Sequence, residues 1–238
     1  MEHRALIFTV HKAASLGVYD VMRRIARKEG WPLHSANIRT PNLQEPEKPG
    51  DENFYHQLGG KTGLVGPVRY PVLIPDDARA SDRFILHLRD PRDVLVSMFF
   101  SYVYSHPGVD EEWRQRQIER GVDEFVRSES KSLIKRYDLY ANEYLSLPNL
   151  TFLRYEEFIA DRPSWLEKLL NGLGVKDGLK RYRRLANDNP AAKVKREDKT
   201  RHIRKATPGD FREKLSPETI ARLNSDWSDI LKTLGYED

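Results

Sequence analysis

The chain has no cysteine among its 238 residues. This absence excludes disulfide bonds, thiolate metal sites and a cysteine nucleophile. Long hydrophobic runs are missing as well, because the run nearest the start, Ala5 to Val10, is too short for a signal peptide or a membrane-spanning helix. We therefore expect an intracellular, cytoplasmic protein with no membrane partner.

A strong charge of one sign is also absent. The formal net charge is only +4, so no global field directs the chain towards nucleic acid. Disorder is excluded by a hydrophobic content of 39% and an aromatic content of 10%. The length suits one domain with a sizeable core, and we expect a single domain over residues 1–238. The composition leaves the oligomeric state open.

Residues 84–104 form the most informative segment. Phe84 to Leu88 is a short apolar run typical of a buried strand. Pro91 ends this run because proline cannot join a strand ladder, and a helical pattern begins at Asp93, which suits the N-cap or the first turn. The segment thus places Arg89 at the carboxyl end of a strand and Ser97 about one helical turn further on, where an anion can bind between them.

Residues 4–30 repeat this strand–loop–helix arrangement. Ala5 to Val10 predicts a strand, His11 to Ser15 is a loop of small residues, and a helical pattern follows until Gly30. A small-residue loop that leads into a helix directs backbone N–H groups at one point, and Lys12 adds a full positive charge there. The loop therefore predicts a phosphate site, with an ordinary turn and a surface lysine as the alternative.

Strand and helix patterns alternate along the rest of the chain. Further strands are predicted at Leu33–Ile38 and Leu150–Arg154, and helices within 110–148 and over 165–173 and 216–234. This alternation predicts an α/β fold with a mostly parallel central sheet and helices on both faces. Residues 31–82 are the least regular, and after the strand at Leu33–Ile38 we predict a long loop that is mobile over a substrate.

Gly60-Lys61-Thr62 is similar to the last three residues of the nucleotide-binding P-loop motif G-x-x-x-x-G-K-[ST]. The first glycine of that motif would fall at position 55, where the chain has Tyr55. Gly63, Gly66 and Pro67 are incompatible with the helix that must follow such a loop. A small-molecule kinase of the P-loop type is therefore a weaker alternative, which a requirement for magnesium and ATP would reveal.

Residues 176–205 contain twelve lysines and arginines against four acidic residues. One interpretation is a solvated surface. Another is a nonenzymatic module that binds an anionic polymer, although aromatic side chains for base stacking are sparse there. The end of the segment is more specific, since Arg204 and Lys205 stand in a predicted turn beside Gly209 and Phe211.

Four segments resemble, in the same order, the motifs of sulfotransferases that use 3′-phosphoadenosine-5′-phosphosulfate (PAPS). The family motifs are P-K-x-G-T-[TS], R-x-P-[KR]-D-x-x-x-S, Y-E-D-[LM] and R-K-G-x-x-G-D-W. The matching segments are His11–Leu16, Arg89–Ser97, Leu153–Phe158 and Ile203–Phe211. The resemblance implies a P-loop-like three-layer fold and transfer of a sulfuryl group from PAPS to a hydroxyl or amine. It also implies a small-molecule, glycan or peptide acceptor, adenosine 3′,5′-bisphosphate (PAP) as the product, and no metal.

The resemblance assigns residues to the donor site. Those implied to hold the 5′-phosphosulfate are Lys12 and the backbone of Ala13, Ala14, Ser15 and Leu16. Those implied to hold the 3′-phosphate are Arg89, Ser97, Arg204 and Lys205. Tyr155 is implied to lie near the adenine. Lys12 and a helix N-terminus directed at the leaving phosphate oxygen would stabilise the negative charge that grows there during transfer.

Three of the departures from the family pattern bear on how closely the loops approach a phosphate. Ala14 and Ala206 replace glycines, and Leu16 replaces a hydroxyl residue. One side-chain contact to phosphate is therefore lost at Leu16, whereas the backbone N–H groups remain.

The proton acceptor is a further departure. Many family members place a histidine about twenty residues before the arginine motif, but Leu64 to Pro71 contains none. Since a histidine or carboxylate suits this role, we predict His56 as the general base, with Asp51 and Glu52 as alternatives. We predict further that Arg69 binds an acidic acceptor, that His87 is structural and that Asp76-Asp77 forms a polar turn.

Overall fold

A computed structural model describes residues 4–36, 42–188, 198 and 205–237. The chain forms two compact units. Unit 1 comprises residues 1–88 and 142–188, and unit 2 comprises residues 89–141 and 189–238. The expected single domain over residues 1–238 thus stays a prediction.

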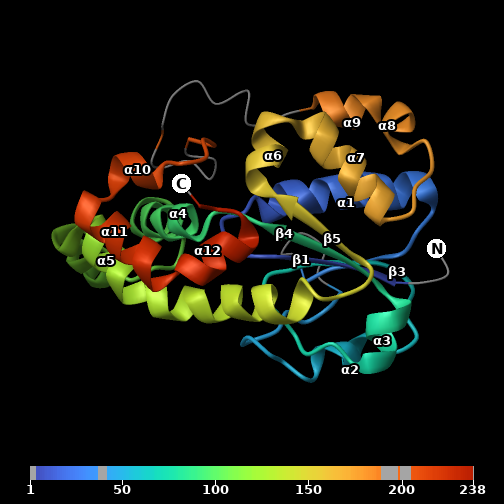
Figure 1. Ribbon diagram of the computed structural model, residues 1–238, viewed down its shortest axis with the longest axis horizontal. Coiled ribbons are helices and arrows are strands. Elements are labelled where there is room, and N and C mark those ends of the chain that lie inside the picture. Colours follow the sequence, from blue (N-terminus) through green and yellow to red (C-terminus); the bar gives the residue numbers. More distant parts are fainter. Residues whose placement is uncertain (1–3, 37–41, 189–197, 199–204, 238) are drawn as a thin grey trace. The chain divides into compact units, whose positions relative to one another are not determined.

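Unit 1 is built on a five-stranded sheet in the order β2-β3-β1-β4-β5 (Figure 1). Every adjacent pair is parallel, which confirms the predicted mostly parallel sheet. From Ala5 onwards β1 is fully buried, as expected for the central strand of a sheet covered on both faces. The strands are β1 (Arg4–Thr9), β2 (Leu33–His34), β3 (Gly63–Val68), β4 (Arg83–Leu88) and β5 (Leu150–Arg154).

Helices cover both faces of this sheet (Figure 1). On one face lie α1 (Ser15–Glu29), α6 (Tyr155–Ala160), α7 (Arg162–Gly172), α8 (Gly178–Arg181) and α9 (Arg183–Asn187). The apolar stripe of α1 packs there with Ile7 of β1, Ile85 of β4 and Trp165 of α7. Because side chains alternate along a strand, β1 supplies Ala5 and Ile7 to this face and Leu6 and Phe8 to the other.

The opposite face carries α2 (Phe54–Leu58) and α3 (Asp76–Ser81) (Figure 1). Here Tyr144 packs edge-on against Phe8 with ring centroids 4.9 Å apart. Its buried hydroxyl accepts the N–H of Val72 at 2.7 Å and donates to the carbonyl of the same residue at 2.9 Å. This pair of hydrogen bonds fixes the chain that leaves β3.

Unit 2 is helical among its described residues. It contains α4 (Pro91–Tyr104), α5 (Glu111–Leu139), α10 (Phe211–Lys214), α11 (Pro217–Asp226) and α12 (Ser228–Leu234). The π-helical turn η1 (Tyr140–Tyr144) follows α5, and its residues from Asn142 onwards belong to unit 1. Side chains cap the longer helices, since Asp90, Asp110 and Ser216 each accept a backbone N–H of the first turn. Phe99 and Phe125 join α4 to α5, with ring centroids 5.4 Å apart.

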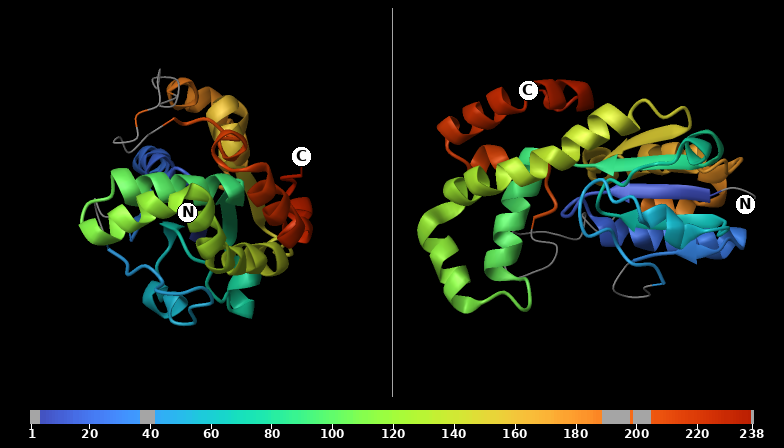
Figure 2. Two further views of the ribbon diagram at one scale, coloured as in Figure 1. Left: turned by 90° about the vertical axis from the view of Figure 1, so that its left-hand side faces the viewer. Right: turned by 90° about the horizontal axis from the view of Figure 1, so that it is seen from below.

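Three helix boundaries differ from those predicted. α4 begins at Pro91, two residues before the predicted start, with Asp90 as its N-cap, while Asp93 lies in the first turn, one of the two places predicted for it. The break in the 110–148 region falls at Gly121, whose φ of 80° suits glycine, and the ribbon of α5 changes direction along its length (Figure 2). The predicted C-terminal helix is divided into α11 and α12 at Trp227, although Ser216 caps it as expected.

The prediction of a long loop after residue 38 is wrong. This region contains α2, α3 and the interior strand β3, while the predicted strand at 33–38 is limited to Leu33–His34, with 37–38 outside the described residues. Asp76 and Asp77 begin α3 and do not form a turn. β3 escaped prediction because Gly66 and Pro67 are typical of turns. In the sheet, Gly66 instead allows close approach of β1, since a Cβ there would lie 2.4 Å from the carbonyl oxygen of Ile7.

We predict that Gly66→Ala lowers the free energy of unfolding by about 2–4 kcal/mol. An added methyl would meet the backbone of Ile7 in addition to the cost of a positive φ. Gly50→Ala is the matched control, because Gly50 has a φ of 74° with no atom within 4 Å of the added Cβ, and it should cost about 1 kcal/mol. Urea denaturation measures both, and equal losses would contradict the close approach.

Candidate functional site

The loop between β1 and α1 is shaped to bind an anion. Lys12 and Ala14 have positive φ values of 68° and 57°, which turn the chain sharply into α1. Ala14 is the N-cap of α1, and no side chain among the described residues caps this end of the helix. The N–H groups of a first helical turn have no partner inside the helix, and they attract negative charge. This end of α1 therefore offers donors to a phosphate.

The Lys12 ammonium lies in an environment that disfavours its charge. Partial burial, and secondarily the nearby positive charge of Arg69, lower the pKa of Lys12 from 10.5 to about 8. An anion bound beside Lys12 would oppose both effects, because it would compensate the charge in a poorly solvated place. The electrostatics of Lys12 thus favour the same ligand as the end of α1.

Arg69 and Glu45 stand next to this loop. Phe8 of β1 pairs with Val68 of β3, so Arg69 leaves the sheet at the end where Lys12 follows β1. Arg69 donates its Nε–H to Glu45 Oε1 at 2.8 Å and its backbone N–H to the same oxygen at 2.9 Å, and a second ion-pair contact joins Nη2 to Oε2. Arg69 is therefore paired with a carboxylate inside the protein, and its predicted role in binding an acidic acceptor stays a prediction.

The sequence did not indicate Glu45 as a site residue. It stands 24 residues before Arg69 in a polar, proline-rich stretch without a motif. Only the folded chain places its carboxylate at the Lys12 end of the sheet.

The position of His56 does not support the general-base role predicted for it. His56 is exposed on α2, next to Tyr55, whose ring lies 5.5 Å from the guanidinium carbon of Arg4. Arg4 also donates to the carbonyl of Gly59 at 3.0 Å, just after α2. Arg4 is the first residue of β1, and Lys12 follows the other end of this strand, which is about 20 Å long for six residues. α2 thus lies at the amino end of the sheet.

The other predicted residues of unit 1 occupy varied positions. The carboxylate of Asp51 accepts the N–H of Asn53 at 2.8 Å and shapes a local turn, and Glu52 is exposed. Tyr155 is buried at the start of α6, directly after β5. Ala13 is buried, whereas Ser15 and Leu16 are partly exposed in the loop and the first turn of α1. Their roles at a donor site stay predictions.

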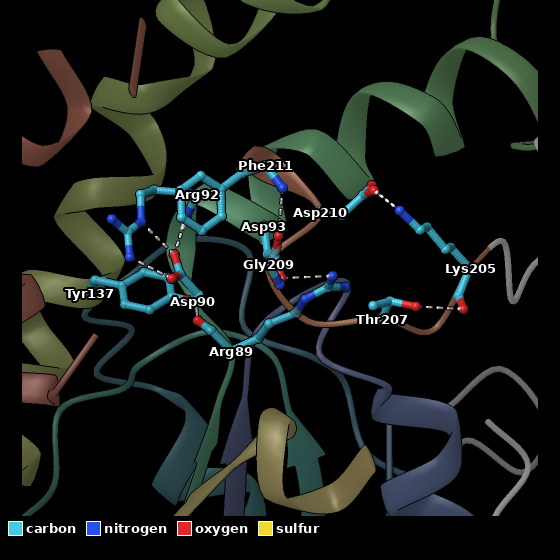
Figure 3. Close-up of polar contacts among 10 residues, drawn as sticks. All are labelled: Arg89, Asp90, Arg92, Asp93, Tyr137, Lys205, Thr207, Gly209, Asp210 and Phe211. Carbon is cyan, nitrogen blue, oxygen red and sulfur yellow. Dashed lines mark hydrogen bonds and ion pairs between the residues drawn. The ribbon is translucent and has the colours of Figure 1, made fainter. Parts of the chain in front are cut away.

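In unit 2, a buried carboxylate connects Arg89 to the segment 205–211 (Figure 3). Asp93 has no solvent exposure. Its Oδ1 accepts the N–H of Phe211 at 3.0 Å, and its Oδ2 accepts the N–H of Gly209 at 2.8 Å. Arg89 Nη2 also donates to Oδ2, at 3.2 Å. Asp93 therefore holds Arg89 and the segment 205–211, here called the glycine loop, in one network. Its position in the helix alone did not reveal this function.

The backbone around Arg89 is fixed by a second set of contacts (Figure 3). Tyr137 donates its hydroxyl to the carbonyl of Arg89. Arg92 donates through Nε and Nη2 to the two oxygens of Asp90, at 3.0 and 2.7 Å, and its guanidinium carbon lies 4.2 Å from the ring centre of Phe211. Burial raises the pKa of Asp90 above its ordinary value, although the hydrogen bonds from Arg92 oppose this. These contacts orient residues 89–92, here called the arginine turn, independently of any ligand.

Lys205 belongs to the same segment. Its ammonium donates to Asp210 at 3.0 Å and to Glu213 at 2.6 Å. Burial lowers the pKa of Lys205, but the hydrogen bonds to these two carboxylates outweigh it, so the pKa is raised and the charge is retained. Ala206, where the family has glycine, has a φ of 53°. Ser97 lies partly buried on α4, and Arg204 falls outside the described residues.

The described residues contain no group of three or more histidines, cysteines, aspartates and glutamates that could hold a metal ion. None of the helices traced in them has the length and apolar character needed to cross a membrane.

Comparison with known proteins identifies relatives of this fold. A family model described as a sulfotransferase domain matches residues 73–235. No curated protein matches the sequence significantly. A crystal structure of a mouse sulfotransferase, SULT7A1, complexed with PAP matches with a TM-score of 0.64 and 16% identity, over 97% of this chain and 84% of that chain.

Two structures of retinol dehydratase also match. One is in a complex with retinol and PAP, with a TM-score of 0.58 and 16% identity, over 96% of this chain and 81% of that chain. The other is in a complex with androsterone and inactive cofactor PAP, with a TM-score of 0.60 and 17% identity, over 96% and 80% of the two chains. At these identities the likeness concerns the fold, and it agrees with the predicted P-loop-like three-layer arrangement.

Proposed function

The chain belongs to the sulfotransferase domain family, and we propose that it transfers a sulfuryl group from PAPS to a hydroxyl or amine and releases PAP. The observation that carries this proposal is the end of α1, which combines N–H donors lacking a side-chain cap with a partly buried lysine. The presence of PAP in all three structural neighbours supports PAPS as the donor. The family match extends over residues of both units, which supports one sulfotransferase domain over residues 1–238.

Lys12 is central to the proposed chemistry. The bond between sulfur and the phosphate oxygen breaks while the acceptor oxygen or nitrogen bonds to sulfur, so negative charge grows on the leaving phosphate. Lys12 and the backbone N–H groups of residues 13–16 bind this phosphate and stabilise the growing charge. With a pKa of about 8, Lys12 is largely protonated at neutral pH and brings its full charge to the step.

The 3′-phosphate is assigned to the arginine turn and the glycine loop. Arg89 and Lys205 supply positive charge, and Asp93 orients both Arg89 and the loop through its hydrogen bonds. Ser97, Arg204 and Tyr155 retain the roles implied by the family motifs, the first two at the 3′-phosphate and the third near the adenine. Arg204 is assigned from its motif alone.

Glu45 replaces His56 as the proposed proton acceptor. Its carboxylate lies at the Lys12 end of the sheet, whereas His56 lies at the amino end. Arg69 holds the carboxylate in place by hydrogen bonds, and a carboxylate is suited to accept the proton that the acceptor loses. For the acceptor itself, retinol and androsterone in the retinol dehydratase structures favour testing small alcohols first.

The donor site is tested by calorimetric titration with PAP. We expect one-to-one binding by the wild type and a dissociation constant at least about 30-fold higher in Arg89→Ala, because a buried charged partner of the phosphate is lost. Arg116→Ala, an exposed arginine on α5, is the matched control and should bind like the wild type. Circular dichroism establishes that each variant is folded.

Absence of PAP binding by a folded wild type would refute the proposal. If the protein then bound an anionic polymer with strong salt dependence, the nonenzymatic module that uses residues 176–205 would replace it.

PAP binding should also weaken as the pH rises. Above pH 7 the phosphates are already ionised, so the remaining change is the loss of the Lys12 proton. In the protein without PAP, the pKa of Lys12 is about 8. Above this pH we expect the dissociation constant to rise about tenfold per pH unit, until the pH reaches the higher pKa that Lys12 has in the PAP complex. Lys12→Arg should show a flat profile between pH 7 and 10, because arginine stays protonated. A pH-dependent loss that persists in this variant would assign the titration to another group.

Glu45→Gln should lower kcat by about 10²–10⁴-fold, the usual contribution of a general base. The assay uses PAPS and the best small alcohol from an acceptor screen. PAP affinity should change little, because the donor contacts remain. His56→Ala is the control and should leave kcat unchanged.

Arg69→Gln breaks the same ion pair but keeps the carboxylate. If it lowered kcat as much as Glu45→Gln does, the ion pair would act by positioning and Glu45 would not be the base.

A further inference from the structure

A buried histidine stands behind the phosphate loop of unit 1. His87 lies on β4 with no solvent exposure, and its partner in the register of β1 is Thr9, the last residue of that strand. His87 Nε2 is 3.0 Å from the carbonyl oxygen of Ala13. On its other side, Trp165 Nε1 is 3.2 Å from His87 Nδ1. One ring thus connects α7 to the loop before α1.

The chemistry of the three partners fixes the direction of both hydrogen bonds. An indole nitrogen can only donate, so His87 Nδ1 accepts from Trp165 and carries no proton. The proton of the neutral ring is therefore on Nε2, which donates to the Ala13 carbonyl. Burial lowers the pKa of His87 to about 4, so the ring keeps this neutral form at pH 7. The hydrogen bonds run from Trp165 through His87 to Ala13.

Aromatic side chains hold the imidazole in this orientation. The ring of His87 lies edge-on to Trp165 at 5.6 Å and to Phe158 at 5.8 Å, and these two rings pack on each other at 4.7 Å. The same cluster contacts α1, since a Cβ at Gly17 would lie 3.1 Å from Phe158 Cζ. The imidazole has little freedom to rotate away from the loop.

The loop needs such a contact. Ala13 stands between Lys12 and Ala14, both at positive φ, a conformation that is unfavourable for residues with a side chain. Its own N–H makes only a long contact of 3.4 Å with the carbonyl of Val10. The hydrogen bond from His87 holds the peptide between the two left-handed residues.

We propose that His87, oriented by Trp165, is a positioning residue for sulfuryl transfer that fixes the Lys12 loop through the Ala13 carbonyl. The proposal rests on the proposed function, in which this loop binds the 5′ end of the donor. His87 touches neither donor nor acceptor. Its effect is to keep Lys12 and the N–H groups of α1 in the arrangement that binds the phosphate.

Substitutions that separate hydrogen bonding from packing test this role. His87→Leu fills a similar volume without a donor or acceptor, and we expect PAP to bind at least tenfold more weakly and kcat to fall. His87→Gln can accept from Trp165 and donate to Ala13, and it should remain within about threefold of the wild type. Trp165→Phe keeps an aromatic ring but removes the N–H, and its effect should lie between these two.

Leu166→Ala is the control for a general loss of stability. Leu166 is buried in the same core cluster and has no polar group. It should lower Tm at least as much as His87→Leu does while leaving PAP affinity unchanged. If Leu166→Ala weakened PAP binding as much as His87→Leu, or if His87→Gln failed to restore it, the positioning role would be refuted.

The tautomer is measured without any ligand. In the ¹⁵N spectrum of histidine-labelled protein, His87 should appear as the neutral form with the proton on Nε2, and Trp165→Phe should change its Nδ1 shift. A proton on Nδ1 would overturn the inference. If the wild type failed to bind PAP, the proposed function would fall and this inference with it. Normal PAP binding by His87→Leu would overturn this inference alone.

Discussion

Parallel pairing of β1 with β3 and β4 is the constraint on which the chemistry of unit 1 depends. Since the strands run in one direction, their carboxyl ends share one edge of the sheet. Lys12 follows β1, Arg69 follows β3, and His87 lies near the end of β4. A cation, an ion pair and a hydrogen-bonding ring are therefore brought together although they are far apart in sequence.

Each unit contains a charged group that is buried or partly buried, and the surroundings of the two groups differ. In unit 2 the buried carboxylate of Asp93 receives hydrogen bonds from two backbone N–H groups and from Arg89, so its charge is compensated by the fold. In unit 1 burial and a like charge lower the pKa of Lys12. The first arrangement organises a loop, and the second favours an anionic ligand.

The fold was largely predictable from sequence, and the details of the site were not. β1, β4 and β5 are apolar runs with clear ends, and α4 begins within two residues of the helical pattern predicted from Asp93. β3 escaped because Gly66 and Pro67 are turn residues elsewhere, and only its place against β1 explains them. His87 was expected to be structural, but its partners Trp165 and Ala13 are long-range contacts without a spacing pattern. His56 and Glu45 show the same limit, since loop residues acquire a position only when the strands around them are placed.

The missing side-chain cap on α1 has a thermodynamic consequence. Backbone donors at a helix end without a side-chain cap are left to water, and a ligand that accepts their hydrogen bonds adds to the stability of the native state. By the proposed function, the nucleotide accepts hydrogen bonds from this end of α1. Because it binds only the native state, it shifts the folding equilibrium towards that state. At a free concentration of 100 times Kd this linkage is worth about 2.7 kcal/mol. A helix without a side-chain cap would then make the stability of the native state depend on the nucleotide concentration.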